Sequence, residues 1–309
     1  MCEHHGTATI TGSVTPPDPA IEAAQVRAMW ETLGLPGIID VHTHFMPPRV
    51  LAKVWDYFDA AGPKIGRPWP ITYREAEDER VERLRSYGVL AFSSMLYPHK
   101  PDMGAWLNAW AAEFASRHPD CLHTATFYPE PAAGDYVRDA VDAGARVFKS
   151  HIQVGEYDPR DPLLEPVWGV LSEAQVPTVI HCGSGPVAGE FTGPEPVAAV
   201  LEQFPELPLI VAHMGMGEYS QFLDLAERYQ NVYLDTTMAF TDFVEETMPF
   251  PEAERGRLAD LGHKILLGTD FPNIPYPYAH QLEALAGLGL GDDWLRAVWH
   301  GNSARLFGL

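Results

Sequence analysis

The sequence predicts an α/β protein, a (β/α)8 barrel of the TIM-barrel type, because one strand–turn–helix unit recurs along the chain. Eight short apolar runs each lead into a Gly- or Pro-containing turn and then a helical stretch. Continuous apolar runs are typical of parallel strands that are covered on both faces. A barrel is the natural closure for eight such units, although a doubly wound sheet fits the same alternation. The runs are 37–44, 89–98, 122–129, 145–151, 177–183, 208–215, 232–237 and 264–272.

The segments between the runs are predicted to be helices. Residues 74–88 place Val81, Leu84 and Tyr87 near one face and end at Gly88. Similar patterns predict helices over 103–118, 135–144, 161–175, 195–204, 219–230, 278–289 and 292–302, and a short closing helix follows. The N-terminus is rich in Thr, Gly and Pro without a period. We therefore assign residues 1–25 to a flexible arm and 26–309 to a single barrel domain.

The composition argues against several classes of partner. The net charge of −21, from 42 acidic and 21 basic residues, disfavours binding to nucleic acid phosphates or anionic membranes. Three cysteines without paired spacing favour a reducing compartment over a disulfide framework. The N-terminus lacks the pattern of a secretory signal, and no apolar run approaches the ~18 residues of a membrane span. We expect a cytoplasmic protein that acts on a small molecule.

Four of the eight apolar runs end in residues that bind metals. Side chains alternate along a strand, so His42 and His44 point the same way and are able to chelate one ion. His181 and His213 occupy equivalent positions after the fifth and sixth runs, and Asp270 follows the eighth. In a barrel the carboxyl ends of all strands meet at one mouth. The sequence therefore predicts a divalent metal site there, where each of these residues binds the metal or takes part in catalysis.

The motifs DVHTHFMPP, VIHCG, VAHMG and GTDFP, in this order, resemble the amidohydrolase superfamily. The closest likeness is to its amidohydrolase 2 branch, which includes the aminocarboxymuconate-semialdehyde decarboxylase-like enzymes, and it spans about residues 37–309. The resemblance implies a barrel with one or two divalent metals, commonly zinc. It makes His42, His44, His181 and Asp270 metal ligands. It also gives His213 a catalytic contact with substrate or water, and makes Asp270 the group that moves protons.

The fourth run leaves the number of metals open. Its segment VFKSH offers Lys149 and His151, which point to one face. Because binuclear members of the superfamily place a carboxylated lysine or a glutamate there, Lys149 is a candidate bridging carbamate, and the alternative is an ordinary cation that binds an acidic substrate. We expect one Zn²⁺, with Mn²⁺, Fe²⁺ or a second metal as alternatives, since nitrogen and oxygen ligands suit all of them.

These residues predict a metal-dependent hydrolase in which metal-activated water attacks a C–N or ester-like bond of a small organic substrate. Asp270 would accept the proton of that water, and His213 would orient the water or polarise the substrate. The same residues suit an alternative reaction, the non-oxidative decarboxylation of a carboxylated aromatic or muconate-like substrate. A barrel that binds metal or ligand without turnover is a minor alternative.

The segment from Pro47 to Tyr73 is long for a βα loop and rich in aromatic and basic residues. Loops at a barrel mouth commonly set specificity, so this segment is expected to form part of the pocket wall. It is equally suited to a hydrophobic subdomain or a homodimer contact. The candidate substrate-binding residues, from this segment and from other loops, are Arg49, Trp69, His99, His151, Asn273 and Tyr276.

Overall fold

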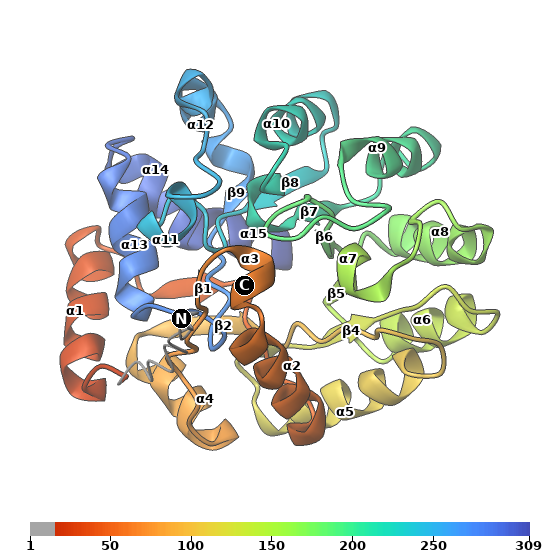
Figure 1. The fold of residues 1–309 in the computed structure, drawn as a ribbon, viewed down its shortest axis with the longest axis horizontal. Coiled ribbons are helices and arrows are strands. Elements are labelled where there is room, and N and C mark those ends of the chain that lie inside the picture. Colours follow the sequence, from red (N-terminus) through yellow and green to blue (C-terminus); the bar gives the residue numbers. More distant parts are fainter. Residues whose placement is uncertain (1–15) are drawn as a thin grey trace, which may run out of the picture.

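The computed structural model describes residues 16–309, which form the predicted (β/α)8 barrel (Figure 1). Each of the eight apolar runs contains one barrel strand, as predicted, and every strand pair within the two sheets, β1 to β3 and β4 to β9, is parallel. The strands are β1 (Ile38–Asp40), β2 (Val89–Ser93), β3 (Cys121–Leu122), β4 (Thr124–Thr126), β5 (Val147–His151), β6 (Thr178–His181), β7 (Leu209–Val211), β8 (Val232–Asp235) and β9 (Ile265–Leu266).

Two details turn nine strand segments into an eight-stranded barrel. β3 and β4 are separated only by His123, whose carbonyl accepts a hydrogen bond from the N–H of Arg146 at 2.8 Å, so they act as one barrel strand. The barrel closes where the N–H of Val41 donates to the carbonyl of Leu267 at 2.9 Å. The first and last apolar runs are therefore neighbours in space, and this closure brings their carboxyl ends together.

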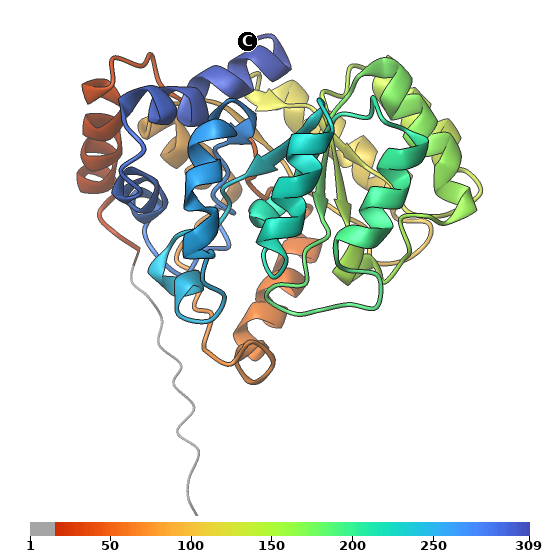
Figure 2. The same ribbon diagram turned by 90° about the horizontal axis from the view of Figure 1, so that it is seen from above.

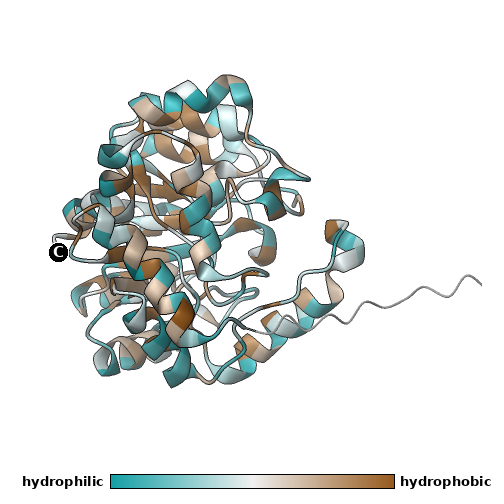
Figure 3. Cartoon of the chain, turned by 90° about the vertical axis from the view of Figure 1, so that its left-hand side faces the viewer, coloured by the Kyte–Doolittle hydropathy of each residue, from teal (hydrophilic) through white to brown (hydrophobic). Residues whose placement is uncertain are grey.

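Helices on the outside surround the strands (Figures 1 and 2), and both hydrophilic and hydrophobic residues lie on them (Figure 3). Inside the barrel, apolar side chains from successive strands, among them Ile39, Val179 and Ile210, form a separate buried cluster. No helix in residues 16–309 is long and apolar enough to cross a membrane. The helices predicted from the sequence are α4 (Glu77–Ser86), α5 (Gly104–Arg117), α6 (Ala133–Asp142), α8 (Glu165–Ala174), α9 (Pro194–Gln203), α10 (Tyr219–Arg228), α13 (Tyr278–Gly287), α14 (Asp292–Arg296) and α15 (Asn302–Phe307).

The assignment of residues 1–25 to a flexible arm is wrong at its boundary, because helix α1 (Pro19–Thr32) begins inside it. The side chain of Asp18 caps this helix by accepting hydrogen bonds from two backbone N–H groups, and Pro19 suits its first position. Glu22 of the same helix is buried and accepts a hydrogen bond from the Tyr73 hydroxyl at 2.6 Å, which ties α1 to the barrel. Residues 1–15 of the expected arm lie outside the described residues.

The long segment after β1 contains two helices that were not predicted, α2 (Pro48–Ala60) and α3 (Gly62–Ile65). They lie in front of the barrel mouth in Figure 1 and stand out from the body of the molecule in Figure 2. The structure also adds short helices after β5 and β8, namely α7 (Ile152–Gly155), α11 (Asp242–Glu245) and α12 (Arg255–Asp260).

Candidate metal centre

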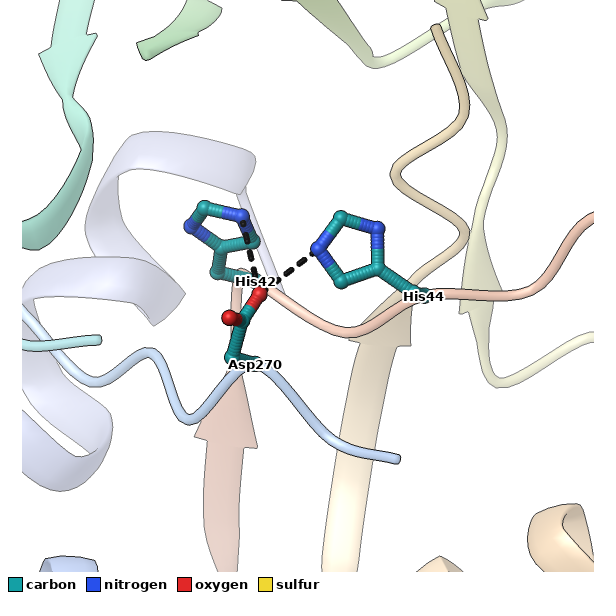
Figure 4. A group of neighbouring side chains, drawn as sticks. All are labelled: His42, His44 and Asp270. Carbon is teal, nitrogen blue, oxygen red and sulfur yellow. Dashed lines mark hydrogen bonds and ion pairs between the residues drawn. The ribbon is translucent and has the colours of Figure 1, made fainter. Parts of the chain in front are cut away.

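Two histidines from the start of the barrel meet an aspartate from its end (Figure 4). His42 and His44 follow β1, and Asp270 follows β9, the strand that closes the barrel beside β1. One Asp270 oxygen, Oδ1, lies 2.7 Å from His44 Nε2 and 3.7 Å from His42 Nε2. Among the described residues these three form a buried group whose ligand atoms all lie within 4.8 Å of one another.

The backbone holds Asp270 in a conformation that few residues adopt. Its φ of 72° lies in the left-handed region, which is strained for an aspartate side chain. Its N–H donates to the carbonyl of His42 at 2.9 Å, and its carbonyl accepts from the N–H of Asn273 at 2.8 Å. Burial alone would raise the pKa of Asp270, but the three neighbouring imidazoles outweigh burial and hold it well below its usual range. The carboxylate is therefore ionised when it faces the histidines.

Hydrogen bonds on the outer side of each ring fix which nitrogen of His42 and His44 faces the centre. His42 Nδ1 lies 2.8 Å from Oδ2 of Asp235, and His44 Nδ1 lies 2.5 Å from the carbonyl oxygen of Met95. Because a carboxylate and a carbonyl only accept, each ring carries its proton on Nδ1. The lone pair of each Nε2 is then directed at the centre, as in histidines that bind metals.

A backbone carbonyl also holds the rings of His181 and His213, at the ends of β6 and β7, but through Nε2 in His181 and through Nδ1 in His213. His213 Nδ1 lies 3.1 Å from the carbonyl oxygen of Thr237, which leaves Nε2 as the acceptor nitrogen. His181 Nε2 lies 3.1 Å from the carbonyl oxygen of Gly185, which leaves Nδ1 as the acceptor. Burial is the largest cause that lowers the pKa of both rings, so both are neutral and keep a free lone pair.

The four predicted ligands do not all belong to the compact group. His181 stands one ring further out: its centroid lies 4.7 Å from that of His213, and the His213 centroid lies 5.3 Å from that of His42. His213 is carried by a backbone turn in which it has a φ of 55°, with Met214 at 56° and Gly215 at 73°. This turn directs the His213 ring into the row between the compact group and His181.

Lys149 and His151 of β5 lie on the same side of the barrel mouth as the histidines. Lys149 is fully buried, and its Nζ lies 3.0 Å from Nε2 of His42. Burial lowers the pKa of this lysine to about 8. The ring of His151 stacks on the ring of His181, with centroids 4.1 Å apart and planes 13° apart. Lys149 is therefore close enough to contact a metal or substrate that His42, His44 and Asp270 bind.

The donor set fits a divalent metal. Nε2 of His44 and Oδ1 of Asp270 lie 2.7 Å apart, so a proton or a cation must lie between these two atoms. A metal ion bound by both atoms and by His42 would take the place of that proton. Two imidazole nitrogens and one carboxylate oxygen form a set that zinc and other first-row divalent metals accept, with positions left for further ligands.

The centre lies in a cavity of about 530 Å³ that opens at the barrel mouth. Five of the six predicted substrate-binding residues line it, namely Arg49, Trp69, His99, His151 and Asn273. The sixth, Tyr276, does not line this cavity: it is buried, and its hydroxyl donates to Gln281 at 3.3 Å, so its role stays a prediction. Because period-2 alternation does not continue into an irregular loop, the direction of this side chain was not predictable from the sequence.

Sequence reasoning missed two buried aspartates that support the centre. Asp235 ends β8 and holds His42, while its Oδ1 accepts the backbone N–H groups of His213 and Thr237 at 2.9 and 3.1 Å. Asp40 ends β1 and accepts the hydroxyl of Thr269 at 2.6 Å. Both carboxylates end a buried strand, and a carboxylate after an apolar run is the signal by which the sequence also indicates Asp270.

Comparisons with known proteins agree with this architecture. The family model described as Amidohydrolase matches residues 39–309. No curated protein sequence matches the chain. Among solved structures, an uncharacterized TIM-barrel protein from Bordetella bronchiseptica has 20% sequence identity and a TM-score of 0.69, with 88% of this chain and 98% of that chain covered.

Two further solved structures share the fold and differ in reaction. A 2,6-dihydroxybenzoate decarboxylase, solved with 2,6-dihydroxybenzoate, has 17% identity and a TM-score of 0.64, with 89% of this chain and 100% of that chain covered. A probable 2-pyrone-4,6-dicarboxylic acid hydrolase from Acinetobacter baumannii, solved with citric acid, has 13% identity and a TM-score of 0.58, with 88% and 100% covered. The family match over most of the chain, together with this barrel, identifies the protein as a metal-dependent enzyme of the amidohydrolase superfamily, in its amidohydrolase 2 branch.

Proposed function

We propose that the protein is a metal-dependent hydrolase that cleaves a C–N or ester-like bond in a small, carboxylate-bearing organic substrate. The observation that carries the proposal is the ionised Asp270 carboxylate, buried in the cavity beside His42 and His44. A base held within reach of a metal site is what hydrolysis requires, because the attacking water must lose a proton as it reacts. His42, His44 and Asp270 would hold the metal, and His181 and His213 would extend the site.

A divalent metal held there supplies Lewis acidity, which makes a water molecule more acidic and polarises a substrate oxygen. Asp270 takes the proton from the attacking water at a carboxylate oxygen and later returns it to the leaving group. The neutral His213 ring orients the water or the substrate through its Nε2, since its Nδ1 is committed to Thr237. Lys149, as an ammonium or as a carbamate, would act at the same centre.

The walls of the cavity favour an anionic substrate. The protein carries a net charge of −21, yet Arg49, Lys53 and Lys64 all line the cavity from α2 and α3. Cations that surround a cleft raise the local concentration of an oppositely charged substrate and bind its carboxylate directly. The aromatic side chains of Tyr57 and Trp69 line the same cavity and offer flat surfaces for a planar substrate.

Decarboxylation is the second candidate, and the cationic wall favours it equally. A carboxylated substrate held by the same cations against the same centre would lose carbon dioxide, and the proton handled by Asp270 would replace it on carbon. The decarboxylase that shares the fold makes this reaction a real alternative. The reaction with ¹⁸O-labelled water distinguishes the two: label in the product supports hydrolysis, whereas release of carbon dioxide without label in the organic product supports decarboxylation.

We further propose one Zn²⁺ per chain, a homodimer and a cytoplasmic location. Elemental analysis of the purified protein tests the first proposal, and two equivalents of metal would favour a carbamate on Lys149 that bridges them. Light scattering tests the second, and cell fractionation the third.

A further inference from the structure

Asn273 lies between the metal centre and the helices over the mouth. It is the third residue after Asp270, is only 2% exposed and lines the cavity. Its backbone N–H donates to the carbonyl of Asp270 at 2.8 Å, and its carbonyl accepts the indole N–H of Trp69 at 2.7 Å. The main chain of Asn273 is therefore fixed from both sides, so only its side-chain amide remains to be oriented.

Trp55 of α2 sets that orientation. Its indole nitrogen lies 3.0 Å from Oδ1 of Asn273, and an indole N–H only donates, so the amide oxygen must face Trp55. The indole is itself held in place, because the guanidinium groups of Arg74 and Arg80 lie 5.4 and 5.7 Å from its ring centroid. Asn273 is thus unable to turn its oxygen towards the cavity without breaking this hydrogen bond.

The amide nitrogen is left for the cavity. Within residues 16–309, Nδ2 of Asn273 has no hydrogen bond to the protein, and it is not among the buried polar atoms that lack a partner. The small exposed fraction of this residue faces the cavity that it lines. Nδ2 therefore presents two N–H donors to a ligand, and the nearby cations of α2 and α3 favour a ligand whose acceptor is negatively charged.

We propose that Asn273 forms a carboxylate-binding subsite and that Trp55, which does not need to touch the ligand, is a positioning residue that makes this subsite reject a carboxamide. A carboxylate offers only acceptors to the fixed Nδ2. A carboxamide offers only one acceptor oxygen, and its N–H groups find no acceptor on Asn273, because Oδ1 is committed to Trp55. The inference rests on the carboxylate-bearing substrate of the proposed function and adds the Trp55–Asn273 hydrogen bond as the feature that selects the carboxylate.

The test measures the binding of benzene-1,3-dicarboxylate and of its neutral diamide to the metal-loaded protein by calorimetry. Trp55→Phe keeps the aromatic ring but lets the Asn273 amide turn over, so the preference for the dicarboxylate over the diamide should fall roughly 10-fold. Asn273→Asp replaces the donors with an anion and should weaken dicarboxylate binding by at least as much. Trp106→Phe, at a half-exposed tryptophan outside the cavity, is the control.

The metal content of every variant is measured alongside, so that loss of metal is not mistaken for loss of the subsite. An unchanged preference in Trp55→Phe overturns the role of Trp55, and so does an equal weakening of both probes, which would mean a structural role only. Unchanged dicarboxylate binding in Asn273→Asp overturns the subsite itself. If the wild-type protein shows no preference for the dicarboxylate, the substrate class fails and the inference fails with it.

Discussion

Replacing Asp235 with asparagine should prevent His42 from binding a metal although the His42 side chain is still present. Oδ1 of Asp235 accepts two backbone N–H groups, from His213 and Thr237, while Oδ2 accepts the Nδ1 proton of His42. In Asp235→Asn the remaining oxygen is held by the two backbone donors, which places the new NH₂ group against His42 Nδ1. Two donors repel each other, so the His42 proton moves to Nε2 and the nitrogen that faces the centre loses its lone pair.

The expected loss of metal affinity is at least about 10- to 100-fold, the usual effect of removing the partner of a metal-binding histidine. That range corresponds to about 1.4–2.8 kcal/mol of metal-binding free energy. We place this variant at the upper end, because the change at Asp235 both removes an acceptor and reverses the tautomer of the His42 ring. Burial adds to the effect, since Asp235 and His42 are at most 1% exposed and water is unable to take the place of the lost partner.

Competition with a chromogenic chelator measures this affinity directly. Asp242→Asn is the matched control, because Asp242 pairs with His280 at 2.8 Å in the same chemistry but on the exposed surface. We expect the control to bind metal like the wild type. Equal metal affinity of Asp235→Asn and wild type, with the fold intact by circular dichroism, would refute the tautomer argument.

Three other outcomes follow from the structure. His42→Ala should lose metal and activity together, whereas Asp270→Asn should lose activity with a smaller loss of metal, as measured by elemental analysis and turnover. Burial raises the pKa of Asp40 from 3.8 to about 7, so between these pH values the folded protein holds a proton that the unfolded chain releases. The free energy of unfolding of the metal-free protein should therefore fall as the pH rises from about 4 to about 7. Denaturant titrations at several pH values measure this dependence, which should be weaker in Asp40→Asn. Gly88→Ala should cost more than Gly144→Ala in thermal unfolding, by about 1–3 kcal/mol, because both have positive φ but only Gly88 has an indole 2.5 Å from the new Cβ.

The strands and the compact centre were predictable because each rests on a short-range pattern. A strand covered on both faces is a continuous apolar run whatever its partners are, so all eight barrel strands could be located from the sequence. The convergence of His42, His44 and Asp270 then follows from closure of the barrel, since parallel strands end at one mouth. The position of His181 outside this group was not predictable, because it depends on ring orientations that long-range contacts set.

The helices over the mouth escaped prediction for a different reason. Helix α2 has apolar residues at helical spacing, of which Leu51 is buried and Val50 and Val54 are partly buried beside it, so a helical pattern was present in the sequence within the segment assigned to a loop. Its position depends on single contacts to distant residues, such as the hydrogen bond from Trp55 to Asn273 and the ion pair of Asp59 with Arg74. Contacts of this kind join residues far apart in the chain and leave no periodic trace in the sequence.

Under the proposed function, substrate specificity therefore depends on side chains of α2 and α3, the two helices that were not predicted from the sequence. The ligands of the centre come from strand ends and would serve hydrolysis or decarboxylation alike. Under the proposed function, the substrate would meet Arg49, Lys53 and Lys64, which line the cavity and whose cationic charge is opposite to that of the chain as a whole. These residues belong to α2 and α3 at the barrel mouth, where substitutions are commonly tolerated without loss of the fold. A variant in which acidic residues replace Arg49 and Lys53 of α2, and which still binds the metal, should thus bind a different class of substrate while it keeps its catalytic activity.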